Sequence, residues 1–209
     1  MKIIKIQQLK YKIKVVHDLG EPFYLDPETV YKFGLRKNDD ITDEKLREIQ
    51  GFDEFIRVKQ AAFRLLARRS HSKKELIAKL TGKEFSKNAA SDVADYLEEN
   101  GYLDDSYFAE LYIKQRMNRK YGFDRIKREL FEKGIENTII TRYELLYSQD
   151  KKNEINIEIV AEKKLKEIQN KVSEPLKIKA RLYNYLVNRG FQRDLIFRTI
   201  EKLLKSNID

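Results

Sequence analysis

The chain of 209 residues carries 43 Lys and Arg against 34 Asp and Glu, a net charge of +9, and 37% of its residues are charged. It has no cysteine and only two histidines, His17 and His71, far apart in the sequence. This composition argues against a disulfide, a thiolate nucleophile and a zinc or haem site. No apolar run approaches the roughly 18 residues that span a bilayer, and the N-terminal residues lack the apolar segment of a secretion signal. We therefore expect a cytoplasmic protein with no metal, no other cofactor and no membrane partner.

The first part of the chain, residues 1–50, differs from the rest and is predicted to form a small N-terminal extension. Polar and apolar residues alternate over 10–15, which is typical of a half-buried strand. Gly20 offers a turn before a second apolar run at 23–25. This pattern predicts a β-hairpin near the N-terminus.

Two short helices are expected to follow this hairpin. Asp26 can cap a helix whose first turn contains Pro27, and Gly34 should end that helix after about two turns. Thr42, followed by two acidic residues, should begin another short helix that ends near Gly51. Both helices are assigned to the extension.

Three stretches of the remaining chain resemble one another. The three copies consist of Leu80, Lys83 and Phe85; Leu130, Lys133 and Ile135; and Leu186, Arg189 and Phe191. In each copy an amphipathic run ends at the Lys or Arg, a turn residue follows, and a second amphipathic run begins. The turn residue is Glu84 in the first copy, Gly134 in the second and Gly190 in the third. So long a period predicts stacked helical units, because one unit alone is too small to bury its apolar faces.

Three helices are expected in each of three units, over residues 53–102, 103–150 and 151–206. Ser72 begins a sequence with the form of a capping box, and Asp104 or its neighbour can cap the first helix of the second unit. The predicted fold is therefore mainly α. It consists of three tandem three-helix repeats in an elongated, curved array, preceded by a small N-terminal β-hairpin and short helices.

Charge is distributed along the repeats in blocks. Arg57–Lys83 holds nine basic residues against one acidic, Glu84–Leu111 holds eight acidic against one basic, and Tyr112–Arg128 holds seven basic against one acidic. The two basic blocks occupy equivalent places in the first two units. A basic groove attracts nucleic-acid phosphates or an acidic protein surface. The alternative is that these residues are only the solvated outer faces of Lys-rich and Glu-rich helices.

Two clusters have the residue types of a catalytic or metal site, but their spacing favours structural roles. His71 lies next to Ser72, yet adjacent residues at a helix start point in different directions, and this serine is already explained as a cap. The possible magnesium ligands are Glu98, Glu99, Asp104 and Asp105. They span the end of one helix and the start of another, where capping accounts for the aspartates. No glycine-rich phosphate loop is present, so neither ATP hydrolysis nor nucleotide redox chemistry is expected. Because no catalytic constellation stands out, we expect no enzymatic activity.

Three longer motifs occur in order along the first two units. They are Arg69-x-His71-Ser72-x-x-Glu75-Leu76, Gly101-Tyr102-Leu103-Asp104-Asp105-x-x-Phe108-Ala109 and Gly122-x-x-Arg125-Ile126-x-x-Glu129-Leu130-x-x-Lys133-Gly134-Ile135. Together they resemble the successive signatures of the RecX family, bacterial regulators of the RecA recombinase. The third unit keeps only the Leu-x-x-Arg-Gly-Phe core. The chain departs from the family at Glu84, where Gly is usual, and at Phe123, where Pro is common.

The resemblance implies a non-enzymatic regulator built from tandem three-helix repeats, with residues 1–50 as an extension found in some members. Such a protein lies along the groove of the RecA nucleoprotein filament on single-stranded DNA. It modulates, and is expected to inhibit, the ATPase and strand exchange of RecA in recombination, DNA repair and the SOS response. We also expect it to be a monomer. The residues expected to contact RecA or DNA are Arg68, Arg69, Lys73, Lys74, Arg116, Arg119, Lys120, Arg125, Lys127 and Arg128.

Two other functions remain open from the sequence. The protein could bind single-stranded nucleic acid on its own, without RecA, or it could be a helical adaptor for an unrelated protein. Salt-dependent affinity for DNA in the absence of RecA would favour the first, and tight binding only to preformed filaments would favour the regulator.

Overall fold

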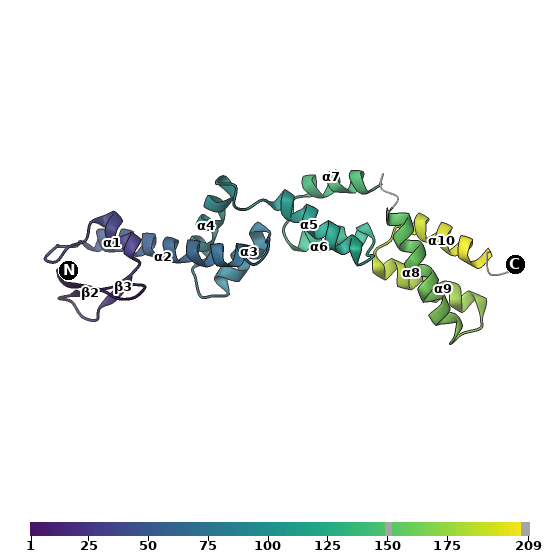
Figure 1. Ribbon diagram of the computed structural model, residues 1–209, viewed down its shortest axis with the longest axis horizontal. Helices are drawn as coiled ribbons and strands as arrows, with labels where there is room; N and C mark the ends of the chain where they lie inside the picture. Colours follow the sequence, from purple (N-terminus) through teal and green to yellow (C-terminus); the bar gives the residue numbers. More distant parts are fainter. Residues whose placement is uncertain (149–151, 206–209) are drawn as a thin grey trace. The chain divides into compact units, whose positions relative to one another are not determined.

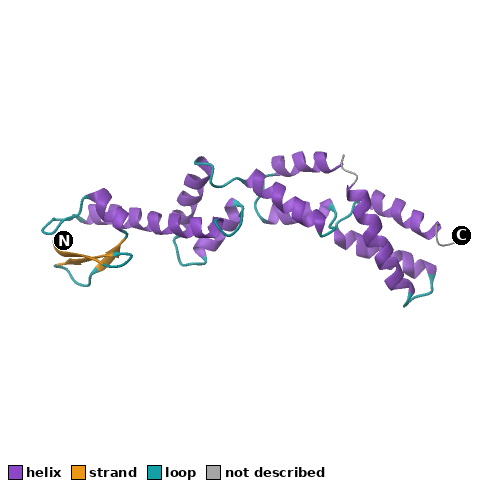
Figure 2. Cartoon of the chain, in the orientation of Figure 1, coloured by secondary structure: helices purple, strands orange, loops and turns teal. Residues whose placement is uncertain are grey.

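The computed structural model describes residues 1–148 and 152–205, and within these ranges it contains three strands and ten helices (Figures 1 and 2). The chain divides into two compact units, Met1–Leu103 and Asp104–Asp209. The first unit contains the N-terminal sheet and four helices, and the second contains six helices. The fold is therefore mainly α, as predicted.

The N-terminal sheet has three antiparallel strands in the order β1 (Ile3–Gln8), β2 (Ile13–His17) and β3 (Phe23–Leu25). The predicted hairpin is the pair β2 and β3, in which Ile13 lies opposite Leu25. Strand β1 was not predicted, because its sequence, IIKIQQ, does not alternate cleanly between polar and apolar residues. The buried face of the sheet contributes to a small core of its own with the segment that follows.

Helix α1 (Pro27–Phe33) has the caps that its sequence predicts. The side chain of Asp26 accepts a hydrogen bond of 2.9 Å from the backbone N–H of Glu28. At the other end Gly34 has φ = 60°, a left-handed conformation that glycine adopts without steric cost.

Helix α2 (Asp43–Leu66) corrects the prediction of a short helix ending near Gly51. Thr42 caps its start as expected, but the helix continues through Gly51 into the first repeat. A glycine inside a helix costs only about 1 kcal/mol relative to alanine, and the buried side chains of Ile49 and Ile56 on either side offset that cost. The extension and the first repeat are therefore joined by one unbroken helix.

A buried carboxylate also joins the extension to this helix. Asp53 of α2 is only 3% exposed. Its carboxylate accepts hydrogen bonds from the backbone N–H of Asp26 at 2.6 Å and from the hydroxyl of Thr29 at 3.1 Å. The guanidinium of Arg57 pairs with its other oxygen at 2.8 Å. Removing the Asp53 carboxylate would leave these buried donors without an acceptor, which is costly. Asp53 therefore holds the start of α1 against α2.

The first repeat is completed by α3 (Lys73–Thr81) and α4 (Lys87–Glu99). The hydroxyl of Ser72 accepts a hydrogen bond of 3.2 Å from the backbone N–H of Glu75, which confirms Ser72 as the cap of α3. Apolar side chains of α2, α3 and α4 form one core cluster. The repeat is a three-helix unit with its own core.

The second unit contains two more three-helix repeats, α5–α7 and α8–α10. Their helices are α5 (Asp105–Asn118), α6 (Phe123–Glu132), α7 (Asn137–Ser148), α8 (Lys152–Gln169), α9 (Pro175–Arg189) and α10 (Arg193–Lys205). Asp104 caps α5 by accepting from the N–H groups of Ser106 and Tyr107 at 2.8 and 3.0 Å. Each repeat again has a separate cluster of buried apolar residues.

The alignment of the three repeats is confirmed by burial. Leu80, Leu130 and Leu186 are each fully buried. The turn that follows them has a left-handed residue in every copy, with φ of 81° at Gly134, 84° at Gly190 and 69° at Glu84. A left-handed conformation costs a non-glycine residue about 1 kcal/mol or more, so the first copy keeps the turn at some expense of stability.

Replacing Leu130 by alanine should lower the free energy of unfolding by about 2 to 5 kcal/mol, because it leaves a cavity in the core of the second repeat. Leu146→Ala removes the same atoms from a position on α7 that is 57% exposed, and it should change stability by no more than about 0.5 kcal/mol. Urea denaturation of both variants tests this. Equal midpoints for the two variants would show that the repeats are misaligned.

Candidate functional site

The basic cluster of the first repeat lies where α2 ends and α3 begins. Arg69 pairs with both carboxylate oxygens of Glu75, at 2.7 and 2.9 Å. The ammonium of Lys73 lies 2.7 Å from Asp95 and 2.5 Å from Glu98 of α4. The hydrogen bond to Asp95, followed by the one to Glu98, raises the pKa of Lys73 well above its usual value. These two cations are already neutralised within the repeat.

The other two cations predicted in the first repeat, Arg68 and Lys74, are exposed. Across residues 1–148 and 152–205 no carboxylate pairs with either of them. They are therefore available to a partner, whereas a partner that engaged Arg69 or Lys73 would have to compete with the internal acids.

His71 and Ser72 are buried, which opposes a catalytic role. His71 is 3% exposed, and its Nδ1 lies 2.9 Å from the carbonyl oxygen of Arg69. Ser72 is fully buried and its hydroxyl caps α3. The buried imidazole therefore has a structural partner in the backbone.

Burial, followed by the charge of Arg69, lowers the pKa of His71. The unfolded chain then takes up a proton near the ordinary histidine pKa of about 6.5, while the folded chain does so only at lower pH. The free energy of unfolding should consequently fall as the pH drops through about 6.5, until the folded pKa is passed. Urea denaturation between about pH 7 and 5.5 should show a shallower decline for His71→Gln. An identical decline in the variant would exclude His71 as the cause.

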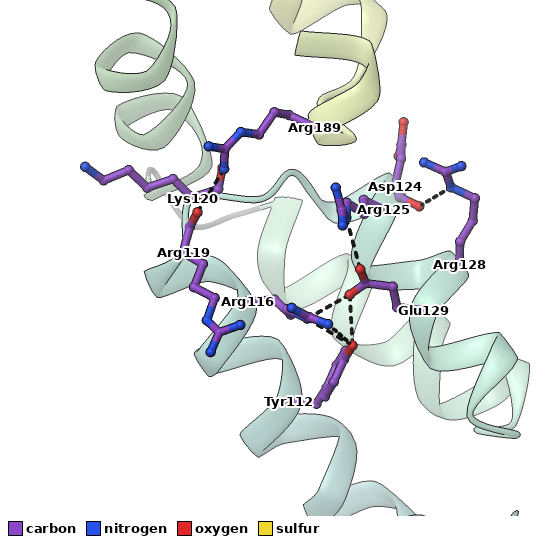
Figure 3. Close-up of polar contacts among 9 residues, drawn as sticks. All are labelled: Tyr112, Arg116, Arg119, Lys120, Asp124, Arg125, Arg128, Glu129 and Arg189. Carbon is purple, nitrogen blue, oxygen red and sulfur yellow. Dashed lines mark hydrogen bonds and ion pairs between the residues drawn. The ribbon is translucent and has the colours of Figure 1, made fainter. Parts of the chain in front are cut away.

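The basic cluster of the second repeat is organised around the carboxylate of Glu129 (Figure 3). The guanidinium of Arg116 on α5 lies 2.8 Å from one oxygen, and that of Arg125 on α6 lies 3.0 Å from the other. The hydroxyl of Tyr112 donates to Glu129 at 2.9 Å. Burial alone would raise the pKa of Glu129, but the hydrogen bonds from Arg125 and Tyr112 hold it below its usual value. The carboxylate thus binds α5 to α6.

Tyr121, in the turn between α5 and α6, is surrounded by guanidinium groups. Their central carbons lie 4.1 Å from the ring centroid for Arg125, 5.0 Å for Arg189 and 5.7 Å for Arg116. Attraction between a cation and the face of an aromatic ring holds such groups together despite their like charge. Arg189 comes from α9 of the third repeat, so the ring also links two repeats.

The backbone completes this junction between the second and third repeats. Arg189 donates to the carbonyl oxygens of Arg119 and Lys120 at 3.0 and 3.4 Å. The N–H of Gly122 donates to the carbonyl of Arg189 at 3.0 Å, and that of Asp124 donates to the carbonyl of Gly190 at 3.1 Å. The Gly190 carbonyl therefore satisfies an N–H at the start of α6, where Gly122 supplies no side-chain cap.

The side chains of three cations of the second repeat lie outside the ion-pair network of Glu129. Arg119 is exposed, and Lys120 extends away from Glu129 in Figure 3. Arg128 is exposed and makes only a 3.4 Å contact with the carbonyl of Asp124. Among the residues that the structure describes, no carboxylate forms an ion pair with any of the three. The remaining cation, Lys127, pairs with Glu144 at 2.8 Å.

The structure thus separates the ten predicted contact residues into two groups. Arg69, Lys73, Arg116, Arg125 and Lys127 are held by acidic residues, and Arg68, Lys74, Arg119, Lys120 and Arg128 form no ion pair with an acidic residue in the part of the chain that the structure describes. Sequence reasoning missed the parts played by Glu129, Tyr121 and Arg189. The four-residue spacing of Arg125 and Glu129 on one helix was an available signal for the first of these.

Two of the four possible magnesium ligands have structural partners. Asp104 caps that helix, and Glu98 pairs with Lys73. Within residues 1–148 and 152–205, no three His, Cys, Asp or Glu side chains come together in a group that could hold a metal ion. In the same ranges no helix has both the length and the apolar character to cross a membrane.

Models of three domains match along the chain. They are the first, second and third three-helix domains of RecX, and they match residues 59–97, 104–142 and 156–200. The regulatory protein RecX of Clostridium beijerinckii is 31% identical over 208 residues, which cover 99% of this chain and 96% of that protein. The regulatory protein RecX of Clostridium acetobutylicum is 32% identical over 209 residues, or 98% and 97% of the two chains.

Solved structures give the same result. A crystal structure of a regulatory protein RecX aligns with a TM-score of 0.76 over 96% of this chain and 98% of that one, and its 18% identity makes this a likeness of fold. The crystal structure of RecX from Lactobacillus salivarius aligns with a TM-score of 0.63 and 25% identity, over 72% of this chain and 97% of that one. With three matched domains and relatives above 30% identity over nearly its full length, the chain belongs to the RecX family of regulatory proteins.

Proposed function

We propose that this protein regulates the RecA recombinase by binding the RecA filament on single-stranded DNA, and that it lowers the ATPase and strand exchange of the filament. It acts by binding and not by catalysis, as a monomer in the cytoplasm. Membership of the RecX family supports RecA as the partner, since the curated relatives carry the name regulatory protein RecX.

The observation that carries this proposal is the set of cations in the second repeat that form no ion pair within the described residues. Arg119, Lys120 and Arg128 occur in a repeat whose other predicted contact residues, Arg116, Arg125 and Lys127, are held by internal ion pairs. Side chains that are neither paired nor needed by the core are free to bind phosphates or the carboxylates of a protein partner. The Glu129 network and the junction with Arg189 fix the backbone that bears Arg119 and Lys120, so less conformational freedom is lost on binding.

The proposal is tested by the RecA ATPase on circular single-stranded DNA, with this protein added at substoichiometric and then saturating ratios. We expect the steady-state rate to fall, and to fall at ratios below one protein per RecA if a bound molecule affects its neighbours in the filament. A rate that stays unchanged at saturation would contradict regulation of the ATPase. Binding to bare single strands with equal affinity would favour an autonomous nucleic-acid-binding protein.

A further inference from the structure

A pocket of about 300 Å³ lies in the unit Met1–Leu103, and its lining residues belong to neither basic cluster. Its wall combines the turn between β1 and β2, strand β3, helix α2 and the loop before α4. The side chains that matter for its chemistry are Tyr11, Lys12, Tyr24, Arg57, Arg64 and Phe85. A volume of this size is at the lower end of the range for ligand pockets. The pocket therefore has room for one small unit of a ligand.

The charge of the pocket is positive. Arg57 is fixed by its ion pair with Asp53 at 2.8 Å, yet its side chain is 47% exposed. Lys12 and Arg64 are exposed, and no carboxylate pairs with them in the part of the chain that the structure describes. An anionic group would therefore meet the charges of Lys12 and Arg64, whereas Arg57 is already paired with Asp53.

One acidic residue, Asp26, also lines the pocket, but its carboxylate is occupied. One oxygen accepts from the backbone N–H of Glu28 at 2.9 Å, and the other accepts from the side-chain amide of Gln60 at 2.8 Å. Both donors are neutral, so Asp26 keeps its negative charge. Lys12 and Arg64, which form no ion pair within the described residues, still outnumber it in the wall.

The aromatic rings in the pocket wall narrow the class of possible ligands further than the positive charge does. Tyr11 and Tyr24 are large rings held at the surface, with 74% and 49% of their area exposed. Carboxylates of an acidic peptide would need only the cations, whereas a nucleotide uses both features: its base stacks on a ring and its phosphate binds Arg or Lys. We propose that this pocket binds one nucleotide of single-stranded DNA, with the base on Tyr24 and the phosphate at Arg64 and Lys12.

This inference extends the proposed function with a contact to DNA that the N-terminal strands share with the first matched domain, which contains Arg64 but not Lys12 or Tyr24. It does not require RecA, so the whole protein is tested with bare oligodeoxythymidylate by fluorescence anisotropy. Tyr24→Ala should weaken binding by at least about fivefold, the lower bound for loss of one base stacked on an aromatic ring. The control is Tyr31→Ala, which removes an 89% exposed ring on α1 outside the pocket and should leave affinity unchanged.

Three further measurements locate the base and the phosphate. An oligonucleotide of the same length without bases should bind wild type and Tyr24→Ala equally. Arg64→Gln should reduce the slope of log affinity against log salt by about 0.7, the value for one phosphate contact on a single strand, whereas Arg47→Gln, an exposed cation of the same helix outside the pocket, should not. Photocrosslinking with 5-iodouracil in the strand should label the peptide that contains Tyr24.

Equal affinities of Tyr24→Ala and Tyr31→Ala, or crosslinks confined to other peptides, would overturn the proposal. An effect of Arg64→Gln without an effect of Tyr24→Ala would also overturn it, because the pocket would then take anionic groups in general. None of these results bears on regulation of RecA, which the ATPase measurement tests separately.

Discussion

Replacing Arg119, Lys120 and Arg128 together by glutamine should weaken binding to the RecA filament while the second repeat stays folded. These side chains form no ion pair with any carboxylate in residues 1–148 and 152–205, so their replacement breaks no ion pair of the described structure. Arg125 is deliberately left in place. It pairs with Glu129 and lies over Tyr121, and its loss would disturb the fold as well as the surface.

A matched control separates these positions from net charge. Lys163, Lys179 and Arg181 are exposed cations of the third repeat outside the predicted contacts, and changing them to glutamine removes the same charge. Filament binding, measured by cosedimentation or by the ATPase of RecA, should be reduced more than tenfold for the first triple variant and little for the second. Equal reductions would mean that only the overall positive charge matters, and no reduction in either would mean that these cations form a solvated face.

Salt dependence then assigns the partner of these cations. Each phosphate of a single strand that the variant no longer neutralises should reduce the slope of log affinity against log salt by about 0.7, so three such phosphates should reduce it by about 2. A change of this size with bare single-stranded DNA would place the second repeat on DNA. Weaker filament binding with an unchanged slope on bare DNA would place it on RecA.

The fold was largely predictable from the sequence because its signals are local. The caps at Asp26, Ser72 and Asp104 depend on a side chain that bonds to an N–H two or three residues away. The repeat alignment depends on buried leucines with the same local surroundings. The prediction at Gly51 was wrong because a local helix-breaking tendency of about 1 kcal/mol yielded to burial of the residues around it.

The candidate site was less predictable, because its contacts join residues far apart in the chain. Arg116 and Arg125 look like binding cations in the sequence, but the fold uses both to hold Glu129. Arg189 has a place in the repeat motif, yet its hydrogen bonds to Arg119 and Lys120 depend on how two repeats meet. A sequence pattern gives the position of each charge along a helix, and only the packed structure shows which charges remain free.

Gly122→Ala should disrupt the junction between the second and third repeats. A Cβ on Gly122 would lie 2.1 Å from the carbonyl oxygen of Gly190 and 2.4 Å from the backbone nitrogen of Phe191. Neither backbone atom can move aside alone, so the bonds from Gly122 to Arg189 and from Asp124 to Gly190 must lengthen or break. Breaking two such bonds, together with overpacking, should cost about 2 to 4 kcal/mol.

The control for this variant is Gly51→Ala, the same change inside α2, where a Cβ would meet nothing within 4 Å. It should raise stability by about 0.5 to 1 kcal/mol, because alanine is the better helix former. The measurements are urea denaturation and hydrogen exchange, in which Gly122→Ala should lose protection at residue 122 and at Asp124. Because the junction also fixes the backbone of Arg119 and Lys120, the variant should bind the RecA filament more weakly although every cation is retained. Wild-type protection at Asp124 in Gly122→Ala would show that the two repeats do not depend on this close approach.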